Sequence, residues 1–232
     1  YDLSMLVDAG WRARLGQVPM VDYVFVFPPA FSAAAELAFR VSGDAFAGMV
    51  VIGCVHSVLA AAIIVWCLHR SEMSDPTTMS LAVCGVLGPF WLTTHLWHSL
   101  QASQAAAACL ATGFMVWKNQ RSVVAHLSVA VTAGWALVCK PNVGPVAAVA
   151  TLALLVAAHE ARRFLPLTFA AAVSVSLAIC RVCRVDPALL METYLDIGWS
   201  RADVNMFLSD DLPMCIRSPT IAGYLLPLLY LL

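Results

Sequence analysis

The feature that most constrains this chain is a series of long apolar runs separated by short polar connections. The runs cover residues 45–68, 79–98, 102–117, 123–139, 143–158 and 164–180, and a further one begins near residue 219. A helix needs about 20 apolar residues to cross the hydrocarbon core of a bilayer. The runs at 102–117 and 143–158 are shorter, so each is either a tilted or extended span or a partly re-entrant segment. The pattern predicts about six to seven transmembrane helices.

The composition also indicates a lipid environment. Of the 232 residues, 61% are hydrophobic and 12% are charged, whereas about 25% are charged in an ordinary soluble domain. The charged residues gather between the apolar runs, as expected where lipid excludes them. We therefore expect an all-α fold, a polytopic helical bundle in a membrane. The net charge of −1 provides no basic face for nucleic acid.

The polar segments divide the chain into four parts. They are a first outer loop, the transmembrane bundle, a second outer loop and the start of a further, truncated helix, at residues 1–45, 46–180, 181–218 and 219–232. Within the first loop, residues 30–41 have the apolar spacing of a short helix lying in the membrane interface. Because the chain begins at Tyr1 and ends inside an apolar run, we expect a fragment of a longer membrane protein.

The alternation of runs and connections predicts a topology. If every run spans, five basic residues fall on one side: Arg70, Lys118, Arg121, Arg162 and Arg163. The positive-inside rule makes that side cytoplasmic. The other eight of the 13 Lys and Arg residues would then lie outside, but most of them share long loops with acidic residues, and long loops weigh less in the rule. This predicts a multi-pass protein of the plasma (inner) membrane, with loops 1–45 and 181–218 on the periplasmic or extracellular face.

Several polar residues at this outer boundary are candidates for chemistry. Asp2 and Asp22 lie where a carboxylate, partly desolvated, has the raised pKa that suits a general base; otherwise they are solvated loop residues. Lys140 occupies a short turn between two runs and either binds an anionic phosphate or extends its amine to the interface. Arg181 and Arg184 would bind the same phosphate or flank a helix.

Histidine and glutamine residues form a second candidate group. His95 and His98 are spaced i, i+3, which suits either a metal site or hydrogen bonds at the interface; Gln101 and Gln104 follow at the same spacing and are candidates to line a polar cavity. No nucleotide-binding motif is present. No cofactor is expected, and a divalent metal ion is left as an open alternative. Cys183 would pair with Cys215 if their loop faces an oxidising compartment.

The first loop resembles a known enzyme superfamily. Its motif reads Asp2-Leu3, Ala9-Gly10, Leu15-Gly16, Pro19, Asp22 and Phe27-Pro28-Pro29. This is similar to the first outer loop of GT-C glycosyltransferases, closest to the polyprenol-phosphate-mannose-dependent mannosyltransferases. Gln104 and Lys140-Pro141 also match positions of that group. The chain departs from the pattern at Met5-Leu6, Met20 and Phe27, which leaves the sugar undetermined.

The resemblance implies a reaction. The enzyme would transfer a sugar, a hexose such as mannose, from a polyprenyl-phosphate donor to a lipid or glycan acceptor with inversion. Asp2 would be the base and Asp22 would orient the acceptor or share that role, while Lys140, Arg181 and Arg184 would bind the phosphate. The alternatives are a transporter or flippase and a non-catalytic scaffold; spans nearly free of charge favour an interfacial site over a path through the membrane.

Overall fold

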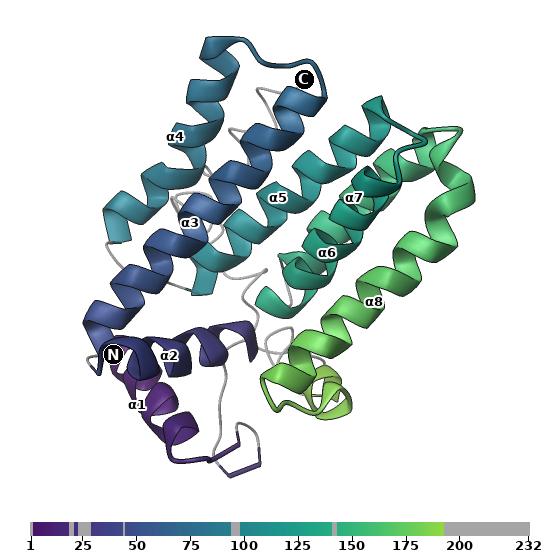
Figure 1. The fold of residues 1–232 in the computed structure, drawn as a ribbon. Coiled ribbons are helices and arrows are strands. Elements are labelled where there is room, and N and C mark those ends of the chain that lie inside the picture. Colours follow the sequence, from purple (N-terminus) through teal and green to yellow (C-terminus); the bar gives the residue numbers. More distant parts are fainter. Residues whose placement is uncertain are drawn as a thin grey trace, which may run out of the picture. The chain divides into compact units, whose positions relative to one another are not determined.

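The computed structural model describes residues 2–18, 21–22, 29–43, 45–93, 98–140 and 143–192, and every regular element within them is a helix. The chain divides into two units, Tyr1–Asp186 and Pro187–Leu232; the second is described only at residues 187–192, which are helical. In the first unit (Figure 1) the helices are α1 (Asp2–Arg14), α2 (Pro29–Ser42), α3 (Ala45–Arg70), α4 (Pro76–Thr93), α5 (His98–Lys118), α6 (Val123–Cys139), α7 (Gly144–Ala157), the short 3-10 helix η1 (Ala161–Phe164) and α8 (Leu165–Val182). The predicted all-α class is confirmed for these residues.

Two of the helical segments are long and apolar enough to cross a membrane. They are Phe46–Arg70, with a mean hydropathy of 2.4, and Ala161–Val182, with a mean hydropathy of 1.8. Pro76–Gly88, Val123–Cys139 and Gly144–Ala157 are apolar but shorter. Six to seven spans therefore stay a prediction, and the run near residue 219 lies outside the described residues.

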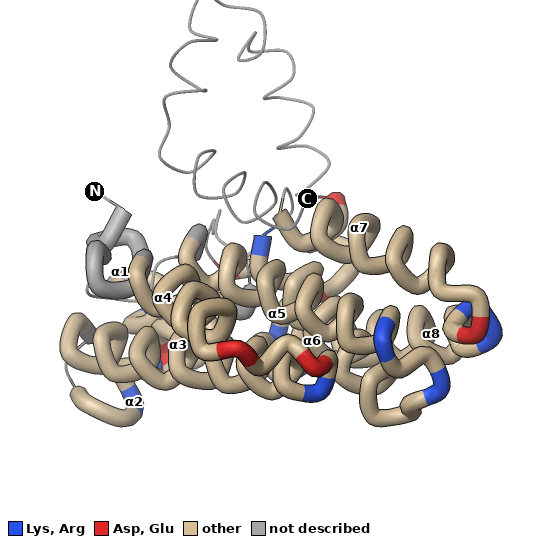
Figure 2. The backbone as a smooth tube through the Cα atoms, turned by 90° about the horizontal axis from the view of Figure 1, so that it is seen from above, with Lys and Arg blue, Asp and Glu red and all other residues tan. Residues whose placement is uncertain are grey.

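Charged side chains are almost absent from the bodies of α3 to α8. In these helices, Lys and Arg occur only in the last turns, at Arg70, Lys118 and Arg181, and no acidic residue occurs at all. Figure 2 shows long tan stretches of tube, with the blue and red segments few and short. Large apolar side chains such as Phe169 and Val146 are exposed on the outside of the bundle. A helix that is apolar all round suits lipid rather than water.

Three connections meet at one end of the bundle. The Asn119 amide donates to the Arg70 carbonyl (3.0 Å), and the Glu160 backbone N–H donates to Gln120 Oε1 (2.8 Å). The Glu160 carboxylate also pairs with Arg121 and Arg163, at 3.3 and 3.4 Å. We call this the basic end. The alternation of the runs predicted that these connections share one end; the side of a membrane that it faces stays a prediction.

The opposite end is formed by α1, α2 and the adjoining helix termini. Helix α2 packs on α1 and α3 and also contacts α6 and α8. Since α6 and α8 both start at the basic end, their last residues reach this second end, which we call the α1–α2 end. The first residues of α5 and α7 reach it for the same reason.

The first 45 residues contain more helix than the sequence predicted. The expected short helix at 30–41 is confirmed as α2, but α1 lies where we expected an irregular loop. Tertiary contacts stabilise α1: a Cβ on Gly10 would lie 2.6 Å from the Phe39 ring, and Trp11 meets that ring edge-on at 6.3 Å. Asp8 adds an ion pair to Arg12 within the helix (2.7 Å).

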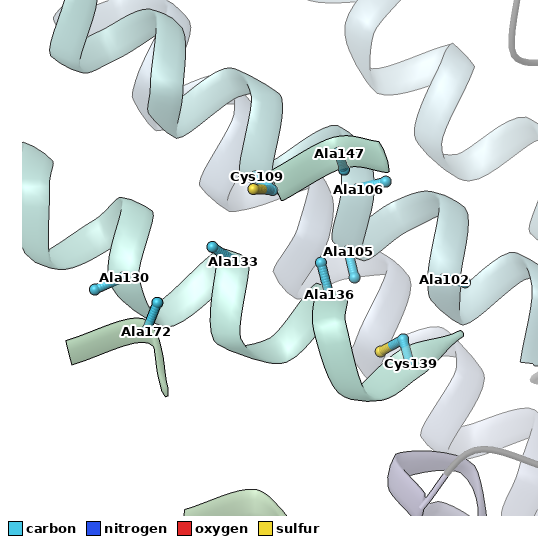
Figure 3. Close-up of a cluster of buried hydrophobic side chains, with 10 residues drawn as sticks. All are labelled: Ala102, Ala105, Ala106, Cys109, Ala130, Ala133, Ala136, Cys139, Ala147 and Ala172. Carbon is cyan, nitrogen blue, oxygen red and sulfur yellow. The ribbon is translucent and has the colours of Figure 1, made fainter. Parts of the chain in front are cut away.

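Small side chains form the core between α5, α6, α7 and α8. The cluster consists of Ala102, Ala105, Ala106, Cys109, Ala130, Ala133, Ala136, Cys139, Ala147 and Ala172. Figure 3 shows Ala136 beside Ala105 and Ala172 beside Ala130. Small residues let helix backbones approach closely, which is how helices associate in a membrane, where lipid removes most of the hydrophobic driving force.

Asp75 caps α4 and makes its start sensitive to pH. Its Oδ1 accepts a hydrogen bond from the Thr78 backbone N–H (2.9 Å), and Pro76 occupies the first helical position, where its missing N–H does no harm. Hydrogen bonds from Thr78 lower the pKa of the Asp75 carboxyl. The ionised cap therefore contributes stability above the pKa of the unfolded chain, and this contribution is lost as the pH falls through the lower, folded pKa.

We expect Asp75→Asn to remove part of the acid sensitivity, because Asn also caps helices but does not titrate. The measurement is the melting temperature of the detergent-solubilised chain between pH 6 and pH 3, which should fall further for the native chain than for the variant. Equal falls would show that the cap does not contribute.

Candidate functional site

The fold brings the elements that carry the predicted catalytic groups to the α1–α2 end. Asp2 is the first residue of α1, Lys140 follows the last residue of α6, and Arg181 and Arg184 lie at the end of α8. The backbone of Asp2 is helical, while its side chain lies outside the described residues. The backbones therefore place the proposed base and the proposed phosphate ligands at one end, although these residues are far apart in the sequence.

The other loop acid, Asp22, has a local role. Its Oδ2 accepts a hydrogen bond from the Val18 backbone N–H (2.6 Å), and its own N–H donates to the Val18 carbonyl (2.9 Å). These bonds close a turn, and the residue is exposed. The geometry fits the solvated-turn alternative better than the base role.

The basic candidates terminate helices. Lys140 is half-buried and its carbonyl accepts hydrogen bonds from the backbone N–H groups of Val143 (3.3 Å) and Gly144 (3.0 Å). Arg184 has a left-handed φ of 57°, which non-glycine residues adopt rarely, and its N–H donates to the Arg181 carbonyl (3.1 Å). Both arginines are exposed. They flank the end of α8, which was one of the two predicted alternatives, and their exposed side chains can reach an anion at that end.

Gln104 lies in a polar cluster inside the bundle. Its amide nitrogen donates to Ser57 Oγ (2.9 Å) and to the Val86 carbonyl (3.0 Å), and its Oε1 lies 2.7 Å from His56 Nδ1. The Trp135 ring packs against the His56 imidazole, with centroids 4.8 Å apart and an interplanar angle of 62°. The cluster thus joins α3, α4, α5 and α6, and Gln104 has polar partners within the bundle; that it lines a cavity stays a prediction.

Sequence reasoning did not single out His56. The available signal was the ionisable residue itself, 11 positions inside α3, in a run otherwise free of charge until its last turn. An ionisable group within an apolar helix is costly and commonly functional.

The predicted histidine pair, His95 and His98, is not described in full. His95 lies outside the described residues, as does the side chain of His98. Within the described part of the chain, no three His, Cys, Asp or Glu side chains gather as a metal site would require.

The structure describes one of the two cysteines of the predicted disulfide. Burial raises the pKa of the Cys183 thiol to about 12, so little thiolate exists near neutral pH to attack a disulfide. Cys215, its proposed partner, lies outside the described residues. The disulfide stays a prediction.

A surface hollow lies at the basic end, away from the predicted site. It is lined by Trp66, Arg70, Met115, Asn119, Ser122, Val124 and Ala125. None of the residues predicted to bind substrate lines this hollow. It therefore adds no support to the chemistry expected at the α1–α2 end.

Comparisons with protein-family models, with curated proteins and with solved structures gave no match.

Proposed function

We propose that the chain acts as a membrane glycosyltransferase of the GT-C type, which transfers a hexose from a polyprenyl-phosphate donor to a lipid or glycan acceptor. The observation that supports the proposal is that α2, which packs on α1, also contacts α6 and α8. An inverting transfer from a phosphate donor needs a carboxylate near the acceptor and cations near the leaving phosphate. Asp2 and the group Lys140, Arg181 and Arg184 supply these two kinds of residue at one end.

In the proposed reaction Asp2 takes the proton of an acceptor hydroxyl. The acceptor oxygen then forms a bond to the anomeric carbon while the bond from that carbon to the phosphate oxygen breaks. The phosphate leaves with the bonding electron pair, and its negative charge is stabilised by Lys140 and the two arginines. Charge develops on the sugar as in other glycosyl transfers. The fold keeps these groups at the end of apolar helices, where a lipid-linked donor and a polar acceptor can meet.

A transporter for a polar or lipid-linked substrate is the second candidate, and one observation favours it. The His56–Gln104 cluster places polar and ionisable groups between four helices, as transport pathways do. The two candidates differ in their product. A transferase makes a new glycosidic bond, whereas a transporter moves its substrate unchanged.

The proposed mechanism requires the α1–α2 end to face outwards, and cysteine labelling tests this. Leu15→Cys and His159→Cys place thiols at exposed positions on the α1–α2 end and the basic end. On intact cells, a membrane-impermeant maleimide should label Leu15→Cys well above the native chain and should label His159→Cys only after permeabilisation. The native chain is the background control because it has cysteines of its own. The opposite pattern would invert the topology and remove the proposed site from the outer face. Gly10 is unsuitable for such a label because Phe39 covers it.

A further inference from the structure

The surface hollow at the basic end lies where α3, α5 and α6 meet. Its polar lining includes Arg70 at the end of α3 and Asn119 and Ser122 in the connection between α5 and α6, and its apolar lining includes Trp66 and Val124. The volume of the hollow is about 140 Å³, whereas one water molecule needs about 10–15 Å³. The hollow is therefore large enough for a phosphate group.

The hollow has one positive charge. Among the described residues that line it, Arg70 alone is charged. Two other arginines of the basic end, Arg121 and Arg163, share the Glu160 carboxylate, while the described residues contain no ion-pair partner for Arg70. A guanidinium presents a planar fork of N–H donors that suits the oxygen atoms of a phosphate. The charge of the hollow thus fits a singly charged anion.

Two neutral side chains add hydrogen-bonding groups beside Arg70. Ser122 Oγ accepts a hydrogen bond from the Ala125 backbone N–H (3.3 Å), which leaves its own hydroxyl proton to donate. The Asn119 amide nitrogen donates to the Arg70 carbonyl (3.0 Å) and so holds the connection against the end of α3. Its Oδ1 atom is an acceptor for a hydroxyl group. The lining therefore suits an oxyanion that also has hydroxyl groups.

The hollow lies at the level expected for lipid head groups. The segment Phe46–Arg70 is long and apolar enough to cross a membrane, and Arg70 is its last residue. Trp66 lies about 6 Å further into the bundle along the helix axis, and tryptophan is enriched at this boundary. Trp66 and Val124 are both exposed. A lipid would place its phosphate on Arg70 and its acyl chains on these apolar side chains, whereas a free phosphate would gain only the polar contacts.

We propose that the hollow at the basic end binds the head group of an anionic phospholipid, with the phosphodiester on Arg70. A phosphodiester has one negative charge, which Arg70 balances, and basic pockets between membrane helices commonly bind anionic lipids. No acidic residue is among the described residues that line the hollow, so nothing there balances the ammonium group of a choline lipid. Phosphatidylglycerol, which has hydroxyl groups and no cation, is the class that fits. This binding does not depend on the sugar transfer proposed for the opposite end.

Quenching of Trp66 fluorescence by brominated lipids tests this proposal. The full chain is placed in phosphatidylcholine nanodiscs with increasing mole fractions of phosphatidylglycerol or phosphatidylcholine brominated on one acyl chain, and Trp66→Phe identifies the emission of Trp66. We expect half-quenching at a lower mole fraction of brominated phosphatidylglycerol than of brominated phosphatidylcholine. Equal quenching by the two lipids would overturn the proposal.

Arg70→Gln should raise the mole fraction of phosphatidylglycerol at half-quenching about three- to tenfold. This is the effect of losing a charge-assisted hydrogen bond, reduced because Arg70 is exposed to water. Arg70→Lys keeps the charge and should retain most of the preference for phosphatidylglycerol. An unchanged preference in Arg70→Gln would exclude Arg70 as the ligand of the phosphate.

Arg162→Gln is the matched control because it removes the same charge at the same end. Arg162 is exposed, does not line the hollow, and donates from Nε to the Val156 carbonyl. Quenching of this variant by phosphatidylglycerol should stay within about twofold of the native chain. An effect as large as that of Arg70→Gln would show that the charge of the whole end attracts the lipid, and this would overturn the assigned site.

Competition with soluble phosphates distinguishes a lipid from a free anion. Glycerol 3-phosphate and inorganic phosphate have phosphate oxygens but no acyl chains. Neither should restore Trp66 fluorescence when added at millimolar concentration to nanodiscs that contain brominated phosphatidylglycerol. Restored fluorescence would assign the hollow to a free phosphate and overturn the assignment to a lipid.

Discussion

Asp2→Asn is expected to abolish sugar transfer from a polyprenyl-phosphate hexose while leaving the chain folded and inserted. Asn keeps the size and hydrogen-bonding capacity of Asp but cannot take a proton, and a general base commonly contributes 10²–10⁴-fold to a rate. The measurement is the formation of glycosylated acceptor in proteoliposomes that contain the protein. The yield of folded protein, followed by size-exclusion chromatography, should be unchanged.

Asp8→Asn is the matched control. Asp8 lies in the same helix, is exposed and pairs with Arg12 at 2.7 Å. An exposed pair of this kind contributes little to stability, so transfer should stay within about twofold of the native rate. Native transfer in Asp2→Asn would exclude Asp2 as the base. Transport of an unmodified substrate by the native protein, without any glycosylated product, would favour the transporter.

Gly134→Leu should prevent the bundle from packing. A Cβ at Gly134 in α6 would lie 2.7 Å from the Ala172 carbonyl oxygen and 2.8 Å from Val175 Cβ, both in α8. Ser176 Oγ also donates to the Gly134 carbonyl (3.1 Å), so separating the two helices would break this bond. Even Gly134→Ala should lower the free energy of unfolding by about 1–3 kcal/mol, the usual cost of overpacking a core. We expect the leucine variant to be recovered only as aggregate.

Gly85→Ala controls for the intrinsic effect of removing a helical glycine. Gly85 in α4 is exposed, and nothing lies within 4 Å of a Cβ added there. Alanine favours helix over glycine by about 0.5–1 kcal/mol, so this variant should melt at or above the temperature of the native chain. If Gly134→Ala melts like Gly85→Ala, close packing of α6 on α8 does not stabilise the fold.

The helices were predictable where a single physical effect determines them. Apolar runs free of charge predict helices in a membrane because each backbone polar group needs a partner within the segment. The alternation of the runs likewise predicted that the connections at Arg70, Arg121 and Arg163 meet at one end. Helix α1 was not predicted because it is stabilised by contacts with α2, such as Trp11 with Phe39, that local sequence does not reveal.

The residue types of the candidate site were predictable from the sequence, but the contacts between these residues were not. Gln104 was expected to line a polar cavity, yet its partners His56 and Val86, which lie 48 and 18 residues away, were not foreseen. No local pattern encodes a contact at that separation. Asp22 is the opposite example. A carboxylate near the interface suits a turn as well as a general base, and the short hydrogen bond from the Val18 N–H to Asp22 is apparent only in the structure.

The alanine-rich core has a consequence for how the four helices α5 to α8 associate. Alanine has no side-chain rotamers to lose on burial, whereas long side chains lose up to about 2 kcal/mol each. Eight of the ten residues of that core are alanine, so assembly immobilises almost no side-chain torsions. The resulting platform of α5 to α8 has few internal degrees of freedom, and it carries Gln104 and Trp135, whose side chains contact the imidazole of His56.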